Sequence, residues 1–387
     1  SFLDFHLWVL YAGQHTWAEY RVLGGQGIPF NVAHAAGNLV YCLAFGPLLV
    51  RSLLRYRDRL EVVWKPLPAS AGAGVLLALA VGFGAFGSGG DARAAAASDP
   101  AQARAITYLA GAQNADGGFG PDRGRPSSQL HTSWAVLGLA AAGRDPRRVR
   151  KGGRSPVDYI VRGIGQVKTT GDVERTILAL AAARRSPRAV GGRDLVTELV
   201  RKRRANGSFA GLVNQTSFAI LALRAAGRPA RDRTVRAAAG WLAAEHNADG
   251  GFNFAGRGGD SGIDDTAAAL QALVAAGKRR TRTVTRAAAF LAARQNADGG
   301  LPLQPGDDSN AQSTAWAIQG LVAAGRDPRR LRRGGARSPL AYIRSLQAAS
   351  GAVRYSRTSI TSPVWVTAQA LTGLARRPFP LRATAIG

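Results

Sequence analysis

The amino-acid sequence predicts an all-α protein in which six helix pairs close into a ring after an N-terminal transmembrane region. The octapeptide Gln113–Gly120 returns with changes as His246–Asn253 and Gln295–Pro302. A leucine near the end of an apolar stretch also recurs about every 40 to 50 residues, which is typical of a repeat fold. Two long stretches without charge near the N-terminus supply the membrane prediction. The recurring leucines are Leu139, Leu180, Leu223, Leu273, Leu321 and Leu374.

Two helices make up each unit. In Ser133–Gly143, apolar residues cover nearly the whole circumference, as expected of a buried helix. The partner stretch Ala237–His246 is rich in alanine and has Trp241 and Leu242 on one side, which suits an outer layer. We therefore expect the second helix of each unit on the inside of the ring and the first helix outside.

An Asp-Gly-Gly turn joins the two helices in three units. Glycine adopts positive φ at little cost, and Asp116, Asp249 and Asp298 can accept hydrogen bonds from nearby backbone N–H groups. The third unit keeps a remnant of this turn, Asn206–Phe209, whereas the second and sixth units have lost it but keep the helix pair.

Closure of the ring is predicted from its end units. Neither has the polar outer face that caps an open array of helix pairs. A ring needs no caps, because its first and last units cover each other. Residues 101–387 are therefore expected to form one closed ring without a sheet, with an axial cavity at one end.

The first ninety residues are predicted to form a membrane region. Residues 1–65 contain the uncharged stretch Ile28–Val50 and then a basic loop, which the positive-inside rule places in the cytoplasm. Residues 66–90 supply a second transmembrane helix or, alternatively, a signal-like segment. Residues 91–100 are expected to form a linker. Because the basic loop before residues 66–90 is placed in the cytoplasm, the ring after them is expected on the extracytoplasmic side of the cell membrane. The chain contains no Met, and we expect its first part to be incomplete.

Two polar residues, His34 and Asn38, lie four apart on one face of the first predicted transmembrane helix. Polar groups at membrane depth are costly and usually face other protein segments or a cavity. The phrase Gly27–Arg59 also resembles the last membrane helix and basic tail of actinobacterial energy-coupling-factor transporter substrate-binding components. That resemblance implies transporter subunits as partners; helix packing in an unrelated membrane protein is the alternative.

The formal net charge is +27, and arginine supplies most of the positive charge. Its clusters, such as Arg147–Arg154 and Arg329–Arg333, fall in connections between units and not on one helix interleaved with aromatic residues. This distribution argues against nucleic acid and favours attraction to an anionic membrane surface. Cys42 is the only cysteine, which excludes both a disulfide framework and a thiolate-ligated zinc site in the ring. No metal or other cofactor is expected.

The recurring Asn-Ala-Asp-Gly-Gly phrase, preceded by Gln or His, resembles the Gln-and-aromatic turn of the squalene-cyclase/prenyltransferase repeat family of terpenoid cyclase-like proteins. The resemblance covers about three quarters of the chain, and it implies a six-over-six α/α toroid. The same toroid serves cyclases, lipid transferases and cobalamin carriers, so the resemblance alone implies no single function.

Residues Gly262–Ala267 resemble the Asp-x-Asp-Asp-Thr-Ala motif with which class II terpene cyclases protonate an alkene or epoxide. The resemblance makes Asp264 the general acid and Asp265 the neighbour that tunes it, since adjacent carboxylates cannot both ionise cheaply. Glycine stands where the motif has its first aspartate. The alternative is that Asp264 or Asp265 caps the N-terminus of a helix.

Alignment of the units on their leucines brings five threonines into register at the mouth of the cavity, and aromatic residues follow two positions later in three units. The threonines either cap helices or contact a ligand. The rings either pack between units or wall a pocket for an apolar ligand or a carbocation. The candidate ligand-binding residues are Thr132, Trp134, Gln215, Phe218, Thr266, Thr314, Trp316 and Thr367.

The sequence supports two functions. The first is a membrane-tethered ring that binds a bulky small molecule, apolar or corrinoid-like, as an accessory of vitamin-type uptake. The alternative is a class II terpene cyclase of the squalene type with Asp264 as its general acid. Gly262 and the expected outward location favour binding, whereas Asp264 and the aromatic residues favour the enzyme.

Overall fold

The chain divides into two compact units, Ser1–Gly90 and Asp91–Gly387. The computed structural model describes Leu43 of the first unit and residues 99–381 of the second.

The membrane predictions fall largely outside these residues. Neither predicted transmembrane stretch, 28–50 or 66–90, is described apart from Leu43, and His34 and Asn38 also lie outside the described residues. Within the part that is described, no helix combines the length and the apolar character needed to cross a membrane.

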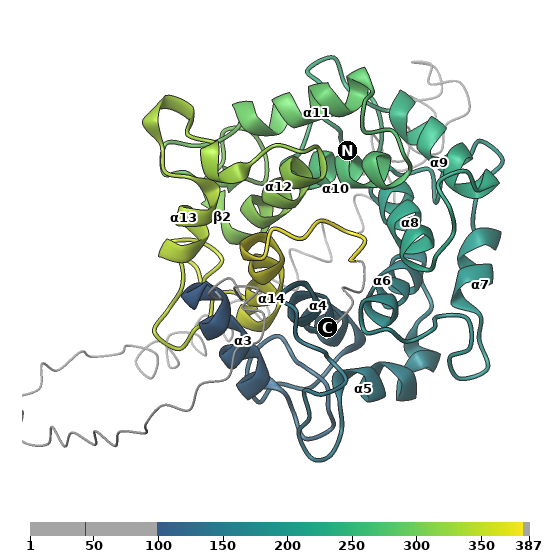
Figure 1. Ribbon diagram of the computed structural model, residues 1–387, viewed down its shortest axis with the longest axis vertical. Coiled ribbons are helices and arrows are strands. Elements are labelled where there is room, and N and C mark those ends of the chain that lie inside the picture. Colours follow the sequence, from purple (N-terminus) through teal and green to yellow (C-terminus); the bar gives the residue numbers. More distant parts are fainter. Residues whose placement is uncertain (1–42, 44–98, 382–387) are drawn as a thin grey trace, which may run out of the picture. The chain divides into compact units, whose positions relative to one another are not determined.

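Helices of the second unit form two concentric layers (Figure 1). Each inner helix contacts the next one along the chain, and the last contacts the first, so the inner layer is a closed ring. The prediction of a closed α/α toroid with the second helix of each unit inside is confirmed. The inner helices are α4 (Gln129–Ala141), α6 (Thr170–Ala182), α8 (Val213–Ala225), α10 (Ile263–Ala275), α12 (Ala311–Ala323) and α14 (Pro363–Leu374). The outer helices are α3 (Pro100–Ala112), α5 (Pro156–Arg162), α7 (Leu195–Arg201), α9 (Arg233–Ala244), α11 (Arg282–Ala293) and α13 (Pro339–Ser345).

Short elements complete the described part. The expectation of a ring without any sheet is wrong in one place, because β1 (Leu301–Pro302) pairs antiparallel with β2 (Ser309–Asn310) in the fifth unit. This two-residue ribbon brings the chain back from a loop to the start of α12. Three 3₁₀ turns lie in connections: η1 (Ile164–Gln166), η2 (Pro328–Arg330) and η3 (Arg333–Gly335).

The Asp-Gly-Gly turns have the predicted geometry. Gly117 has a φ of 86°, and the N–H of the following Gly118 donates to Asp116 Oδ1 at 2.8 Å. The equivalent bonds form at Asp249 and Asp298. The sixth unit also keeps a turn of this kind, with Gly351 at a φ of 89° and with Ser350 in place of the aspartate. The loss of the turn expected in that unit is therefore wrong.

Each turn also joins its unit to the next. The Gln295 side-chain Nε2 donates to its own turn at Gly299 O (2.9 Å) and to Arg337 O at the start of the next unit (2.8 Å). In the sixth unit, Gln347 Nε2 reaches Ala101 O of α3 at 2.9 Å. The first and last outer helices are thus joined by the same amide that joins other neighbours.

The inner helices approach one another through small residues. A Cβ at Gly138 of α4 would lie 2.6 Å from Ala368 O of α14, and one at Gly373 of α14 would lie 2.9 Å from Ala315 of α12. Only glycine permits these distances. The close contacts bring the six inner helices together tightly enough for their side chains to meet across the axis.

Candidate functional site at the mouth of the ring

The five aligned threonines hold the turns in place. In each unit that has one, the hydroxyl oxygen accepts a hydrogen bond of 2.8 to 3.0 Å from the backbone N–H of the first apolar residue after the turn. All five threonines are fully buried. These bonds satisfy the hydroxyls within the fold, and ligand contact by the threonines stays a prediction. The pairs are Thr132 with Phe119, Thr216 with Phe209, Thr266 with Phe252, Thr314 with Leu301 and Thr367 with Val353.

The threonines do not cap the helices. The caps lie about four residues earlier, where Ser128 accepts from the His131 N–H and Asn310 accepts from the Ser313 N–H. The capping role considered for these threonines is therefore wrong.

The three aromatic residues two positions after the threonines meet across the axis. The ring of Trp134 lies 6.0 Å from Trp316 and 6.5 Å from Phe218, and the rings of Phe218 and Trp316 are 5.6 Å apart. All three contacts are edge-to-face, which is a favoured geometry for aromatic pairs. The side chains come from α4, α8 and α12, so alternate inner helices fill the axis at this level.

The C-terminal segment adds a fourth ring from the other end of the axis. Phe379 lies 6.3 Å from Trp134 and 5.7 Å from Trp316, and it is almost fully buried. The Phe379 N–H donates to Gln271 Oε1 (2.8 Å), and Gln319 Nε2 donates to Arg377 O (2.8 Å). Figure 1 shows this yellow segment crossing the centre of the ring after α14. We call these four residues the axial aromatic cluster.

One helical turn nearer the N-termini, the inner helices carry polar side chains. Residues three or four positions apart lie on the same face of a helix. The residues one and two positions before each threonine therefore share a face with the position two after it, where the aromatic residues lie, and they line the axis above the aromatic cluster. Two contacts join α14 to its neighbours here: His131 of α4 faces Trp365 edge-on at 6.0 Å, and Gln312 Nε2 of α12 donates to Gln369 Oε1 at 2.5 Å. Burial, and secondarily the charge of Arg175, lower the pKa of His131. We call this polar layer the mouth.

Asp264 is the second residue of α10 and belongs to the mouth. Part of the residue reaches the surface, but its Oδ1 is buried and has no hydrogen-bond partner. Burial chiefly, with a smaller contribution from the charge of Asp265, raises the pKa of Asp264 to about 7 against the opposing effect of a hydrogen bond from Ser313. The positive end of a helix dipole stabilises a carboxylate by only about 1 kcal/mol or less at most sites. The effect of desolvation on the pKa of Asp264 is larger than that. The carboxyl can therefore hold a proton at neutral pH.

Asp265 has a different neighbour. The Asn214 amide of α8 donates to its Oδ1 at a long 3.5 Å. Burial raises the pKa of Asp265 as well, with Asn214 opposing the shift. The helix begins with Gly262 as its N-cap, without a side-chain bond to the cap position, so the predicted capping role of Asp264 or Asp265 is wrong.

Gly262 leaves little room for the aspartate that the class II motif has there. A Cβ at this position would lie 3.2 Å from both Asp265 Oδ2 and Gln304 Nε2. The Gln304 side chain comes from the loop after β1. A neutral amide thus stands beside the aspartate pair where the motif places a third carboxyl group.

Unpartnered polar atoms gather at this level. Buried polar atoms in proteins nearly always have a hydrogen-bond partner, so those without one indicate where water or a ligand binds. Four belong to the mouth and the adjoining loop: Gln215 Oε1, Asp264 Oδ1, Gln304 Oε1 and Trp365 Nε1. Trp365 occupies in the sixth unit the position that Asp264 occupies in the fourth, so the repeat could have predicted it. Gln304 and Phe379 lie in connections that carry no repeat signal.

No cluster of three or more His, Cys, Asp and Glu residues suited to a metal ion occurs among residues 99–381. Of the residues predicted to form the site, Asp264 and Asp265 lie together at the mouth, and Trp134, Phe218 and Trp316 lie together beneath it.

Family models match two parts of the chain. Residues 93–155 match the prenyltransferase alpha-alpha toroid domain, and residues 166–304 match the squalene-hopene cyclase C-terminal domain. The second match contains Asp264 and Asp265. No curated protein matches the chain in sequence.

Solved structures share the fold. A protein from Actinoplanes is 17% identical, with a TM-score of 0.51 over 71% of this chain and 98% of its own. The type II terpene cyclase MstE from Scytonema is 14% identical, with a TM-score of 0.50 over 71% and 96%. An MstE variant in complex with geranylgeranyl dihydroxybenzoate is 13% identical, with a TM-score of 0.51 over the same shares. Together with the family models, these similarities identify residues 99–381 as an α/α toroid similar in fold to terpene cyclases.

Proposed function

We propose that this protein is an enzyme of the class II terpene cyclase type, in which Asp264 protonates an alkene or epoxide of an isoprenoid-like substrate. One observation carries the proposal: a carboxyl group with a pKa of about 7 has a buried, unpartnered oxygen at the mouth of the ring. A general acid that works near neutral pH needs a raised pKa of this kind. The family match over residues 166–304 and the MstE neighbours support the same reaction class.

The chemistry follows from the order of the layers. Asp264 gives its proton to one alkene carbon, whose π electrons form the new C–H bond and leave a carbocation on the other carbon. The axial aromatic cluster lies directly below, and its rings offer negative faces to a cation. The carboxylate left behind keeps the Ser313 hydrogen bond and the positive end of α10, which stabilise it.

The substrate proposed for this site has a polar group near its reacting end. The side chains of Gln215, Gln304 and Trp365 each have a buried polar atom that needs a partner. A hydroxyl or phenol group can donate one hydrogen bond to an amide oxygen or accept one from the indole N–H. A purely hydrocarbon substrate would leave all three atoms unsatisfied, at a cost of about 1–3 kcal/mol for each.

The test is turnover by the full chain. The protein is incubated with squalene, squalene epoxide and linear prenylated phenols, and cyclised products are sought by mass spectrometry. Asp264→Asn should abolish the product, since it keeps the shape but removes the acid. The matched control is Asp260→Asn, an exposed aspartate nearby. Equal product from wild type and Asp264→Asn would contradict the proposal.

A second candidate is binding without turnover, with a bulky apolar or corrinoid-like molecule delivered to a membrane transporter. Gly262, beside the amide of Gln304, favours it, because the site lacks one of the motif's carboxyl groups. The transporter-like phrase Gly27–Arg59 supports a tether at the extracytoplasmic face of the cell membrane. Tight binding of such a molecule, unchanged in Asp264→Asn and without product, would favour this candidate.

A further inference from the structure

All six inner helices end in the same way. A residue with positive φ follows each helix, and the next residue donates its backbone N–H to the carbonyl five positions earlier, as in Arg144 N–H to Leu139 O and Lys278 N–H to Leu273 O, both 2.9 Å. This is the Schellman type of helix end. The residue that makes this bond is basic in every unit. The six residues are Arg144, Arg185, Arg228, Lys278, Arg326 and Arg377.

These six positions lie on one face of the ring, which we call the C-terminal face. The inner helices follow one another around the ring in the same direction, so their C-terminal ends lie together. Arg224 Nε at the end of α8 donates to Ala275 O at the end of α10 (2.7 Å). A cavity of about 360 Å³ is lined by the ends of α10 and α12 and by residues 377–380.

Positive charge is concentrated on this face. The six stretches that directly follow the inner helices (143–148, 184–188, 227–232, 277–280, 325–330 and 376–377) contain 16 Lys and Arg and 3 Asp. At the opposite end, the six turns between outer and inner helices (113–119, 163–169, 203–209, 246–252, 295–301 and 347–353) contain 3 Lys and Arg and 3 Asp. The stretches that follow the inner helices are therefore strongly basic, whereas the six turns themselves carry equal numbers of basic and acidic residues.

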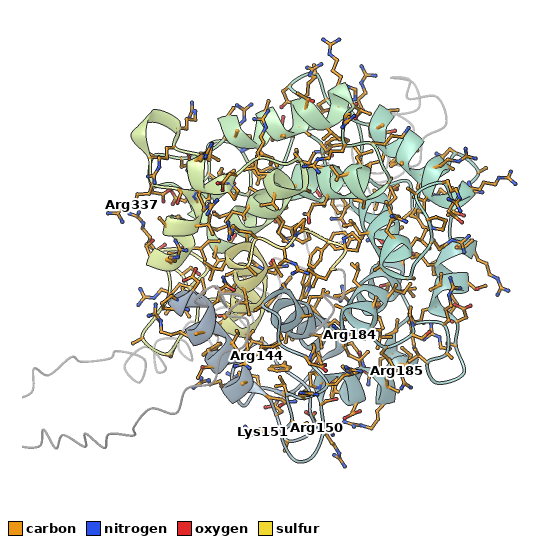
Figure 2. All side chains as sticks on the ribbon, viewed as in Figure 1. Arg144, Arg150, Lys151, Arg184, Arg185 and Arg337 are labelled. Atoms are coloured by element: carbon orange, nitrogen blue, oxygen red, sulfur yellow. The ribbon has the colours of Figure 1, made fainter. Side chains whose placement is uncertain are left out.

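The acidic residues on the C-terminal face already have partners. Asp145 binds Arg147, Asp327 binds Arg329, both at 2.8 Å, and Asp232 binds Arg228 at 2.6 Å. Arg185, Lys278 and Arg326 are exposed. Figure 2 shows Arg144, Arg184 and Arg185 along the part of the ring formed by α4, α5 and α6.

Helix stability explains part of this charge but not its extent. A cation near a helix C-terminus interacts favourably with the helix dipole, and that effect falls off within the last turn. Arg148, Arg280 and Arg330 lie further along the connections and are exposed. A surface that concentrates one sign of charge in this way attracts a partner of the opposite sign.

We infer that the C-terminal face binds the surface of a bilayer that contains anionic lipids. Nucleic acid is the other extended polyanion, but single strands bind through stacking on exposed rings. Within residues 99–381, the exposed large apolar side chains are Phe254, Leu303 and Ile360, and all three lie in connections at the opposite end. A face with charge distributed around a ring and without exposed rings suits a flat surface of head groups.

Hydrogen exchange of the full chain, in lipid nanodiscs of phosphatidylcholine with or without phosphatidylglycerol, tests the inference. Amides of 143–148, 277–280 and 325–330 should exchange more slowly in the anionic discs, and the difference should vanish in 1 M salt, where the Debye length is only about 3 Å. The turn at 113–119 should exchange equally in both lipids.

The variant that tests the charges is Arg185→Ser with Lys278→Ser. Its protection in anionic discs should fall roughly tenfold or more, since each well-placed charge contributes about fivefold to binding. The matched control is Arg125→Ser with Arg257→Ser, which removes two exposed charges from the other end of the ring. Equal exchange in both lipids, an equal loss in the control, or protection by duplex DNA and not by anionic discs would each overturn the inference.

Discussion

The backbone N–H of Val364 in α14 donates to the carbonyl oxygen of Pro121 at 3.1 Å. Val364 belongs to the sixth unit and Pro121 to the first, so this bond closes the ring at its mouth. Neighbouring units are joined in the same way elsewhere, as by the bond from Ala311 N–H to Tyr355 O at 2.7 Å. On the outer layer, Arg344 and Asp99 form an ion pair at 2.8 Å across the same seam.

The seam depends on Gly138, which allows α4 to approach α14. Gly138→Ala should destabilise the protein by about 3 kcal/mol or more, because its Cβ would lie 2.6 Å from a backbone oxygen that cannot move alone. Gly240→Ala in α9 is the matched control, since open space surrounds that position, and it should stabilise by about 0.5–1 kcal/mol. Urea unfolding of the two variants measures both effects. Similar changes in stability would show that the close approach does not hold the seam.

The Thr314 hydroxyl satisfies the buried N–H of Leu301. Thr314→Val keeps the shape but leaves that N–H without a partner, so it should cost about 1–3 kcal/mol of stability. Thr314→Ser should cost less, because the hydroxyl remains. Thr358→Val, at an exposed threonine, is the control for the same substitution. Thermal unfolding checks the series, and a Thr314→Val protein as stable as the wild type would mean that the turn is held by other contacts.

Asp264 makes stability depend on pH in a defined direction. Its pKa is about 7 in the folded protein against an ordinary value of 3.8, so between these values the folded state holds a proton that the unfolded state has released. The contribution of Asp264 to the free energy of unfolding should therefore be complete below about pH 4 and fall as pH rises to 7, by on the order of 4 kcal/mol. Asp264→Asn should remove this dependence and be more stable than wild type at pH 8. Parallel pH profiles for the two proteins would refute the raised pKa.

Phe379 closes the axis at the C-terminal face. Phe379→Ala removes one ring of the axial aromatic cluster and should cost about 3 kcal/mol or somewhat less, since the segment that carries it lies at the end of the chain. The variant should also bind an apolar fluorescent dye more strongly, because the axis opens on that side. Phe254→Ala, an exposed ring at the other end, serves as the control. Unchanged dye binding in Phe379→Ala would show that the axis stays closed without the ring.

Much of the fold could be predicted from the repeat. The Asp-Gly-Gly turns fixed the boundary between the helices of a unit, and the all-round apolar character of Ser133–Gly143 placed the second helix inside. The sixth turn was missed because Ser350 replaces the aspartate, although Gly351 alone supplies the positive φ that the turn requires.

The site was harder to predict because it depends on contacts between units. The spacing of Trp134, Phe218 and Trp316 indicated inward rings but not that alternate helices bring them into contact. Asp264 was found through its motif, whereas its raised pKa comes from burial by neighbouring units. Phe379 could not be foreseen, because it comes from a segment after the last repeat.

Closure gives this chain a late final step in folding. The partners Asp99 and Arg344 are 245 residues apart in sequence, and Gln102 and Leu374, which also meet across the seam, are 272 apart. Contacts of such long range form slowly, since the whole intervening chain must be ordered first. While the protein is being synthesised, the surfaces of α3 and α4 that will receive α14 stay uncovered until the last helix emerges. An open array of repeats can lose a unit and still be complete, but here a chain shortened by one unit would leave two apolar faces with nothing to cover them.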